Sequence, residues 1–387
     1  MFVLGGYQSD FARNLAREGT DLAALTGELV DGALADAALA ITDVEVIHVG
    51  NAFGELFARQ AQMGALPATA RPALWGVPAS RHEAACASGS AAILAAMADL
   101  EAGRYDVALV VGVELERSVP GDEAARIMGT AAWTGHEGET AKFLWPHMFD
   151  RIAEAYAERF GLDRGHLRAI SEHNLRAARG NPRAQTRSWH QVEWSDATAN
   201  PIVEGSLTRL ECSQVTDGGA AIVLASDRWL AAHPRRAPRI LGWGHRTAAL
   251  SLEAKLARRD GPLLVPHVAT AAEDARRRAG GAPIDAYEVH DCFAITEYLA
   301  IDHLGLTPPG ESYRAIDDNR IARINATGGL IGGGHPVGAT GIRMVLDAAR
   351  QVTGRAGDCQ LPDVSRVQTL NIGGSATTAI SFVVGES

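Results

Sequence analysis

The chain has only four cysteines in 387 residues, and no two of them form a CxxC pair. Because disulfide frameworks belong mainly to small secreted domains, we expect these cysteines to be reduced thiols in a cytoplasmic protein. No apolar run approaches the ~20 residues that a membrane-spanning helix needs. The first residues also become polar too early for a secretory signal peptide. The sequence therefore predicts neither a disulfide scaffold nor a membrane segment.

A surplus of basic residues is also missing. The formal net charge is −10 at pH 7, which argues against non-specific binding of nucleic acid or of an anionic membrane. The chain has no GxxxxGK[ST] sequence and no clean GxGxxG after a strand, so nucleotide binding is not indicated. The segment from His82 to Cys86 lacks the second histidine of the zinc motif HExxH, so we predict no metal site.

Apolar segments alternate with helical ones in a pattern typical of α/β proteins. Residues 44–49 and 107–112 are strand-like, and residues 21–40 have a helical pattern. The near-continuous apolar character of the strands suits a mostly parallel sheet that is buried on both faces. At 387 residues the chain exceeds one ordinary core, so two domains or a large insertion are expected.

The composition changes between about residues 118 and 200, which are rich in tryptophan, histidine and arginine. We interpret this stretch as a loop domain inserted into the first half of the chain, because such insertions often shape binding sites. A proline- and arginine-rich linker at residues 234–238 then separates the halves. We therefore predict a first half over residues 1–233 and a second half over residues 234–387. The two halves have similar patterns, which is a weak internal repeat.

Cys86 lies where a strand-like run gives way to a helical pattern over residues 86–100. A thiol at a helix N-terminus faces unpaired backbone N–H groups and the positive end of the helix dipole, which favours the thiolate. The small residues Ala87, Ser88 and Gly89 leave room for a substrate carbonyl. This setting suits a cysteine nucleophile, although a small buried thiol has the same local pattern.

Three further blocks join Cys86-Ala87-Ser88-Gly89 along the chain. They are His290-Asp291-Cys292-Phe293, Gly334-His335-Pro336-Val337-Gly338-Ala339-Thr340-Gly341 and Asn371-Ile372-Gly373-Gly374. In this order, the four blocks resemble the catalytic blocks of the thiolase family, and the resemblance covers essentially the whole chain. It implies the thiolase fold, with two similar βαβαβαββ halves in five layers (αβαβα) and an inserted loop domain.

Two departures from the common thiolase pattern narrow the resemblance. Many thiolases have Asn-Glu-Ala-Phe where this chain has His290-Asp291-Cys292-Phe293, and a second catalytic cysteine where it has Asn371. The His-Asp-Cys-Phe block is instead similar to thiolases related to sterol carrier protein. The resemblance to that subfamily implies that Cys292, rather than residue 371, acts as the acid/base.

The resemblance also implies a role for each site residue. Cys86 would be the acyl-carrying nucleophile, activated by His335, and Cys292 would move the Cα proton of the second thioester. His290 and His335 would donate to the enolate oxygen. The backbone N–H groups of Cys86 and Gly373 would form the second oxyanion hole.

The predicted substrates are coenzyme A (CoA) and acyl-CoA, with no tightly bound cofactor. Candidate CoA contacts are His147, Arg183 and Arg187 in the insertion, for which a solvated basic helix face and a satellite apolar cluster are equally good explanations. The resemblance implies a homodimer or homotetramer. Some bacterial members of the subfamily also work with a small zinc-containing OB-fold protein, which makes such a protein a candidate partner.

The reaction class favoured by these residues is Claisen condensation of acyl-CoAs, or thiolysis of 3-ketoacyl-CoA in reverse. Two other reactions on the same fold stay open, decarboxylating condensation and retro-aldol cleavage. Cys292 disfavours the decarboxylating reaction, because loss of CO₂ forms the carbanion without a base. A non-catalytic subunit that binds CoA esters is a third alternative, which the presence of all the catalytic blocks disfavours.

Overall fold

The computed structural model describes residues 1–258 and 261–386, and its centre is a nine-stranded sheet with the order β3-β2-β4-β7-β1-β8-β11-β10-β9. A separate hairpin pairs β5 with β6. The strand bounds are β1 Phe2–Gln8, β2 Val46–Gly50, β3 Ala79–His82, β4 Val107–Glu114, β5 Ile202–Glu204, β6 Leu207–Thr208, β7 Gly218–Ala225, β8 Arg239–Thr247, β9 Ala286–Val289, β10 Arg366–Gly373 and β11 Thr378–Gly385.

The two halves of this sheet repeat one arrangement. In the first half β2 is parallel to β4, while β4 and β1 are both antiparallel to β7. In the second half β9 is parallel to β10, while β10 and β8 are both antiparallel to β11. The halves meet where Phe2 of β1 pairs with Arg239 of β8. This repeat confirms the predicted pair of similar halves.

The second half departs from the predicted pattern in one respect, because its described residues contain no counterpart of the edge strand β3. The corresponding part of the chain is the glycine-rich segment over residues 325–336. Glycine and proline disfavour a regular strand, since glycine has no side chain to pack and proline cannot donate to the ladder. That segment forms an irregular loop next to the site instead.

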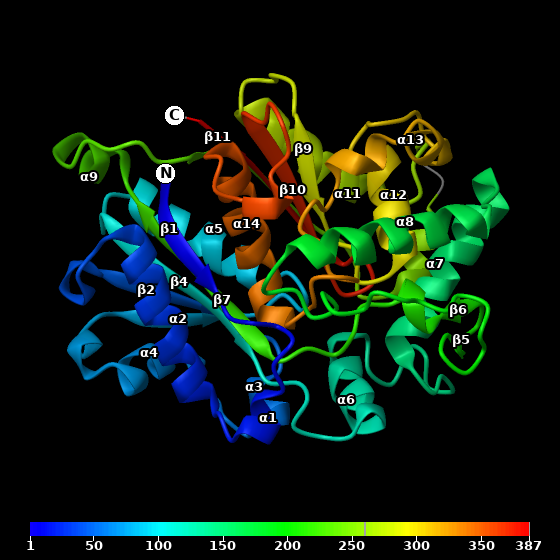
Figure 1. The fold of residues 1–387 in the computed structure, drawn as a ribbon, viewed down its shortest axis with the longest axis horizontal. Coiled ribbons are helices and arrows are strands. Elements are labelled where there is room, and N and C mark those ends of the chain that lie inside the picture. Colours follow the sequence, from blue (N-terminus) through cyan, green and yellow to red (C-terminus); the bar gives the residue numbers. More distant parts are fainter. Residues whose placement is uncertain (259–260, 387) are drawn as a thin grey trace.

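Helices cover both outer faces of the sheet halves and fill the space between them (Figure 1). α2 packs on the outer face of the first half and α11 on that of the second, with α5 and α14 side by side between the halves. The helix bounds are α1 Leu15–Glu18, α2 Leu22–Ala37, α3 Gly54–Phe57, α4 Leu66–Ala70, α5 Ser88–Glu101, α6 Gly121–Met128, α7 Leu144–Phe160, α8 Arg164–Ala177, α9 Asp227–Ala232, α10 Leu252–Leu256, α11 Pro266–Arg278, α12 Ala294–His303, α13 Tyr313–Asp317 and α14 Thr340–Val352. This gives the predicted five layers.

Burial on both faces explains the apolar strands. Along β4, Val107, Leu109 and Val111 pack in the cluster that contains α2, whereas Ala108 and Val110 pack in the cluster of α5 and α14. Successive side chains of a strand point to opposite faces, so a strand covered by helices on both sides needs apolar residues throughout.

The segment that connects β4 to β7 covers residues 115–217 and carries α6, α7, α8 and the β5–β6 hairpin. The predicted insertion at about 118–200 falls within this segment, and its bounds stay a prediction. The predicted division between residues 233 and 234 falls between α9 and β8 and stays a prediction. Within the described part of the chain, every helix is too short or too polar to span a bilayer.

Candidate active site

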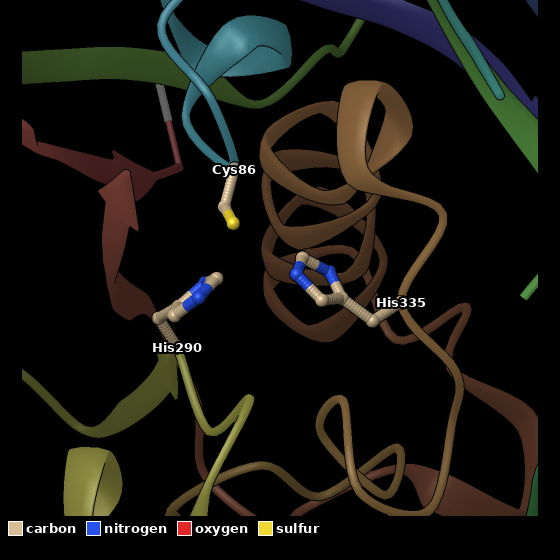
Figure 2. A group of neighbouring side chains, drawn as sticks. All are labelled: Cys86, His290 and His335. Carbon is tan, nitrogen blue, oxygen red and sulfur yellow. The ribbon is translucent and has the colours of Figure 1, made fainter. Parts of the chain in front are cut away.

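Three segments that are distant in sequence bring Cys86, His290 and His335 together. Cys86 lies in the turn between β3 and α5, His290 directly follows β9, and His335 ends the glycine-rich segment before the short 3-10 helix Val337–Ala339. Figure 2 shows both imidazole rings directed toward the sulphur. One ligand-type atom from each side chain lies within 4.8 Å of the others, and the two rings are nearly perpendicular, at 82°.

The turn before α5 presents the Cys86 sulphur. Ala85 has a φ of 49°, in the left-handed region that costs a residue with a side chain about 1–2 kcal/mol. The Ser88 hydroxyl stabilises this turn, because it donates to the Ala85 carbonyl at 2.6 Å and accepts from the Ala84 N–H at 2.9 Å. As a result α5 begins at Ser88, two residues later than predicted, and Cys86 precedes the helix.

The protonation of Cys86 differs from the sequence-based expectation. Burial raises the pKa of the thiol to about 12, although a backbone hydrogen bond from Gly374 acts in the opposite direction. Loss of hydration destabilises the thiolate more than the backbone hydrogen bonds to the sulphur stabilise it. The thiol is therefore the stable form of the free site, so attack by the sulphur requires a base.

His335 can act as the base that takes the Cys86 proton, because its Nε2 carries a free lone pair. Its Nδ1 lies 2.6 Å from the Thr340 hydroxyl oxygen, which itself donates to the Pro336 carbonyl at 3.0 Å. Because the single hydroxyl proton is used there, Nδ1–H of His335 donates to Thr340 and Nε2 is left unprotonated. Burial and the Arg343 guanidinium lower the pKa of His335 to about 3, so the ring is neutral and able to accept a proton.

His290 is fixed in the opposite tautomer by Asn371. The Asn371 Nδ2 group lies 3.1 Å from both His290 Nδ1 and the Cys86 carbonyl oxygen, and the Ser90 hydroxyl donates to Asn371 Oδ1 at 2.8 Å. Rotating this amide would place two oxygens against each other, so Nδ2 must face both acceptors. His290 therefore accepts at Nδ1 and carries its proton at Nε2. The sequence excluded Asn371 as a second cysteine but gave no sign of this orienting role.

Asp291 anchors the loop that carries His335. Its buried carboxylate accepts from the backbone N–H groups of Leu330 at 2.6 Å and Ile331 at 3.1 Å. Gly329 lies so close that a Cβ there would be 2.4 Å from Asp291 Oδ2, which explains a glycine at this position. The Asp291 carboxylate thus supports the site from behind.

A cavity of about 470 Å³ extends from these residues into the insertion. Cys86, Cys292, His335 and Gly374 line it together with a largely apolar wall. The large apolar side chains of that wall are Phe53, Met128, Phe143, Trp145, Phe149, Val203, Val215, Phe293 and Val337. Such a cavity can hold an apolar acyl group next to a thiol.

Cys292 lies in the same wall and is buried. Its sulphur is 3.7 Å from the Thr296 hydroxyl oxygen, and burial, together with the neighbouring Cys86, raises its pKa well above the ordinary value. Gly373 lies against the Cys86 turn, since a Cβ there would be 2.2 Å from the Ala84 carbonyl oxygen. A separate backbone hydrogen bond, from Gly374, reaches the Cys86 sulphur itself.

His147, Arg183 and Arg187, the three predicted CoA contacts, do not line this cavity. Arg187 pairs with Asp10 at 2.7 Å, and Arg183 stacks on the Tyr7 ring at 4.4 Å and donates to a backbone carbonyl. Both arginines therefore attach the insertion to the first half of the chain, a role that competes with the predicted CoA contact. His147 is half-buried on α7, outside the cavity wall that its neighbours line. Arg209, which was not predicted, is exposed and lines the cavity.

Comparison with known protein families shows to which family this chain belongs. The family model described as "Thiolase, N-terminal domain" matches residues 1–188, and "Thiolase C-terminal domain-like" matches residues 249–386. The chain belongs to the thiolase family. Acetyl-CoA acetyltransferase of Methanothermobacter thermautotrophicus is 31% identical over 90% of this chain and 90% of that protein. Human sterol carrier protein 2 is 27% identical over 98% of this chain and 71% of that protein. These relatives confirm the predicted family and its acyltransferase class.

Two solved structures show the same fold. The one described as "Ltp2-ChsH2(DUF35) aldolase" has a TM-score of 0.79 and 20% identity, and covers 100% of this chain and 97% of that chain. Acat5 thiolase from Ascaris suum in complex with coenzyme A has a TM-score of 0.73 and 17% identity, and covers 100% of this chain and 99% of that chain. At these identities the likeness establishes the thiolase fold alone.

Proposed function

We propose that this thiolase transfers acyl groups between CoA thioesters through an acyl-Cys86 intermediate. The observation that carries the proposal is the pairing of two neutral histidines of opposite tautomer with one thiol beside an apolar cavity. One histidine can accept a proton and the other can donate a hydrogen bond, and a two-step acyl transfer needs both functions.

In the first step the Cys86 sulphur attacks the thioester carbonyl of the donor while His335 Nε2 takes the thiol proton. Because the pKa of the thiol is about 12, this proton is removed during the attack. The backbone N–H groups of Cys86 and Gly373 stabilise the oxyanion. The C–S bond to CoA then breaks, and the departing CoA thiolate takes the Cys292 thiol proton, which leaves Cys292 as the thiolate and the Cys86 proton on His335.

In the second step Cys292 removes a Cα proton from the acceptor thioester. The enolate oxygen accepts from Nε2–H of His290, and the enolate carbon attacks the acyl-Cys86 carbonyl. The Cys86–carbon bond breaks, His335 returns its proton to the freed Cys86 thiolate, and a 3-ketoacyl-CoA leaves. Thiolysis follows the same steps in reverse.

Arg209 is the proposed contact for the CoA phosphates in place of Arg183 and Arg187. It is exposed at the cavity, and its guanidinium lies 5.6 Å above the Trp189 ring, where a phosphate can still reach it. Among the described residues, no carboxylate forms an ion pair with Arg209. Replacement of Arg209 by alanine should raise KM for CoA, whereas replacement of Arg183 should leave it unchanged.

The test is mass spectrometry of the intact protein after mixing with acetoacetyl-CoA. The wild type should gain the mass of one acetyl group, and C86A should gain none. Consumption of acetoacetyl-CoA with added CoA, followed through its enolate absorbance, should stop in C86A. An acetylated C86A protein, or a wild type that turns over without any acyl adduct, would contradict the assignment.

The proposal also covers the oligomeric state, a partner protein and the cellular location. As the family resemblance suggests, the chain should form a homodimer or homotetramer, which light scattering on the purified protein tests. A small OB-fold protein is the proposed partner, in line with the ChsH2(DUF35) component of the aldolase whose fold this chain shares. Cytoplasmic location is proposed because all four cysteines are free thiols.

A further inference from the structure

Glu116 is a carboxyl group in the wall of the acyl cavity that the proposed reaction does not use. It lies just beyond the end of β4, is 1% exposed and shares the cavity with Cys86 and His335. Among the described residues, no arginine, lysine or histidine forms an ion pair with it. A buried carboxyl without a cation is costly, so its other partners decide what it does.

The partners of Glu116 are backbone groups on either side of the catalytic loop. Its Oε1 accepts from the Val337 N–H at 2.9 Å, and a backbone hydrogen bond also comes from Thr216. The Thr216 hydroxyl accepts in turn from the His335 N–H at 2.9 Å. These bonds fix the direction of the carboxyl, but they leave part of its hydrogen-bonding capacity free, since a carboxyl group offers about four sites.

The neighbouring Glu114 shows what a purely structural carboxylate looks like in this place. It accepts from Asn51 Nδ2 and from the backbone N–H groups of Ala52, Phe53 and Gly338, at 2.7 to 3.0 Å. Four donors satisfy it, and it does not line the cavity. Glu116 has fewer donors and faces the space that an acyl group would occupy.

The surroundings of Glu116 also favour its neutral form. Burial, with the nearby Glu114 and Asp217 carboxylates, raises its pKa well above the ordinary value. A neutral carboxyl donates one hydrogen bond and accepts others, so it can pair with a hydroxyl or with a carbonyl oxygen. A plain hydrocarbon chain in the cavity would leave this group without a partner, at a cost that disfavours such a substrate.

We propose that the acyl group handled by this enzyme is apolar in bulk but carries a neutral oxygen function, a hydroxyl or a ketone, beyond the reacting carbons, and that the Glu116 carboxyl recognises it. This inference rests on the proposed function, because it assumes that the acyl group occupies the cavity beside Cys86. The surrounding aromatic and aliphatic side chains would bury the rest of the acyl group.

Binding to the C86A protein tests the inference without any turnover. Calorimetry would compare a saturated acyl-CoA with a panel of the same chain length that carries one hydroxyl or ketone at successive positions beyond Cβ. At least one oxygenated member should bind about tenfold more tightly than the plain chain, as expected for one net hydrogen bond. The preference should persist in C86A/E116Q, whose amide also donates and accepts, and should disappear in C86A/E116L.

The matched control is C86A/D122N, since Asp122 also lines the cavity but is exposed. It should keep the preference. Equal affinity across the panel in C86A would overturn the proposal, and that result does not depend on whether E116L folds. A preference that survives in a folded E116L variant would overturn it as well. Absence of acyl-enzyme in the wild type, by contrast, would contradict the proposed function and leave the binding result to stand by itself.

Discussion

The Thr340 hydroxyl oxygen lies 2.6 Å from Nδ1 of His335, and its own proton is donated to the Pro336 carbonyl. This contact determines which nitrogen of His335 is free to take the Cys86 proton. Since Thr340 is the first residue of α14, the helix that fills the space between the sheet halves also orients the catalytic base.

Replacing Thr340 by valine should therefore lower kcat about tenfold to a hundredfold, because the unprotonated nitrogen is no longer confined to Nε2 and general-base catalysis is weakened. The measurement is steady-state thiolysis of acetoacetyl-CoA, with thermal unfolding to check the fold. T340S keeps the hydroxyl and should retain most of the activity. Equal losses in both variants would contradict the orienting role.

Replacing Asn371 by aspartate should reverse the tautomer of His290. In N371D a carboxylate would replace the Asn371 amide donor, so His290 would bind a proton at Nδ1 and its pKa would rise. The hydrogen-bond donor at Nε2 would then be present only on the cationic ring at low pH. We expect kcat to fall about tenfold or more at neutral pH and the pH profile to gain a new acidic limb. N371A removes the donor without this charge and should not add that limb.

Replacing Cys292 by alanine should separate the two half-reactions. C292A should still form the acetyl-enzyme at Cys86, because that step does not need a Cα base. It should lose the exchange of the acetyl-CoA Cα protons with deuterated water, by about a hundredfold or more. Mass spectrometry follows the first step and NMR the second. Persistent exchange in C292A would show that another group moves the proton.

The motifs predicted which residues meet at the site, but not how they are protonated. The thiolase resemblance named Cys86, His290, Cys292 and His335, and the fold brings all four to one place. The pKa of Cys86 depends on burial from all sides, which a local helix pattern cannot reveal. The tautomers likewise depend on contacts made only after folding.

Arg187 shows a related limit of prediction from the sequence alone. Arg187 and Asp10 are far apart in sequence yet form an ion pair in the structure, and an arginine-rich composition cannot reveal such a partner. The covering of both sheet faces, by contrast, was predictable from the strands, because strands that are apolar throughout must be buried on both sides. The five layers and the two similar halves were predicted only from the thiolase resemblance.

Because His335 is buried and neutral, we expect the folded protein to lose stability in acid. The folded pKa of His335 is about 3, below its ordinary value of 6.5, so its contribution to stability is complete above about pH 6.5 and is lost as the pH falls toward 3. The unfolded chain binds this proton first. The free energy of unfolding by urea should therefore decrease from pH 6.5 to pH 4 more steeply in the wild type than in H335Q. Buried carboxyls with raised pKa act in the opposite direction, and comparison of the two proteins cancels their contribution. Parallel curves would contradict the prediction.

The same three side chains should make the enzyme sensitive to zinc. Cys86, His290 and His335 offer a sulphur and two imidazole nitrogens within 4.8 Å of one another, and zinc prefers such ligands. Binding requires a deprotonated thiol, so inhibition should strengthen as the pH rises from about 6 to about 8. The measurement is the zinc concentration that halves the initial rate at each pH, with EDTA to restore activity. Calorimetry on C86A should show weaker zinc binding than on the wild type, because the sulphur ligand is missing. Zinc affinity that is unchanged in C86A, or inhibition that is independent of pH, would place the metal elsewhere on the protein.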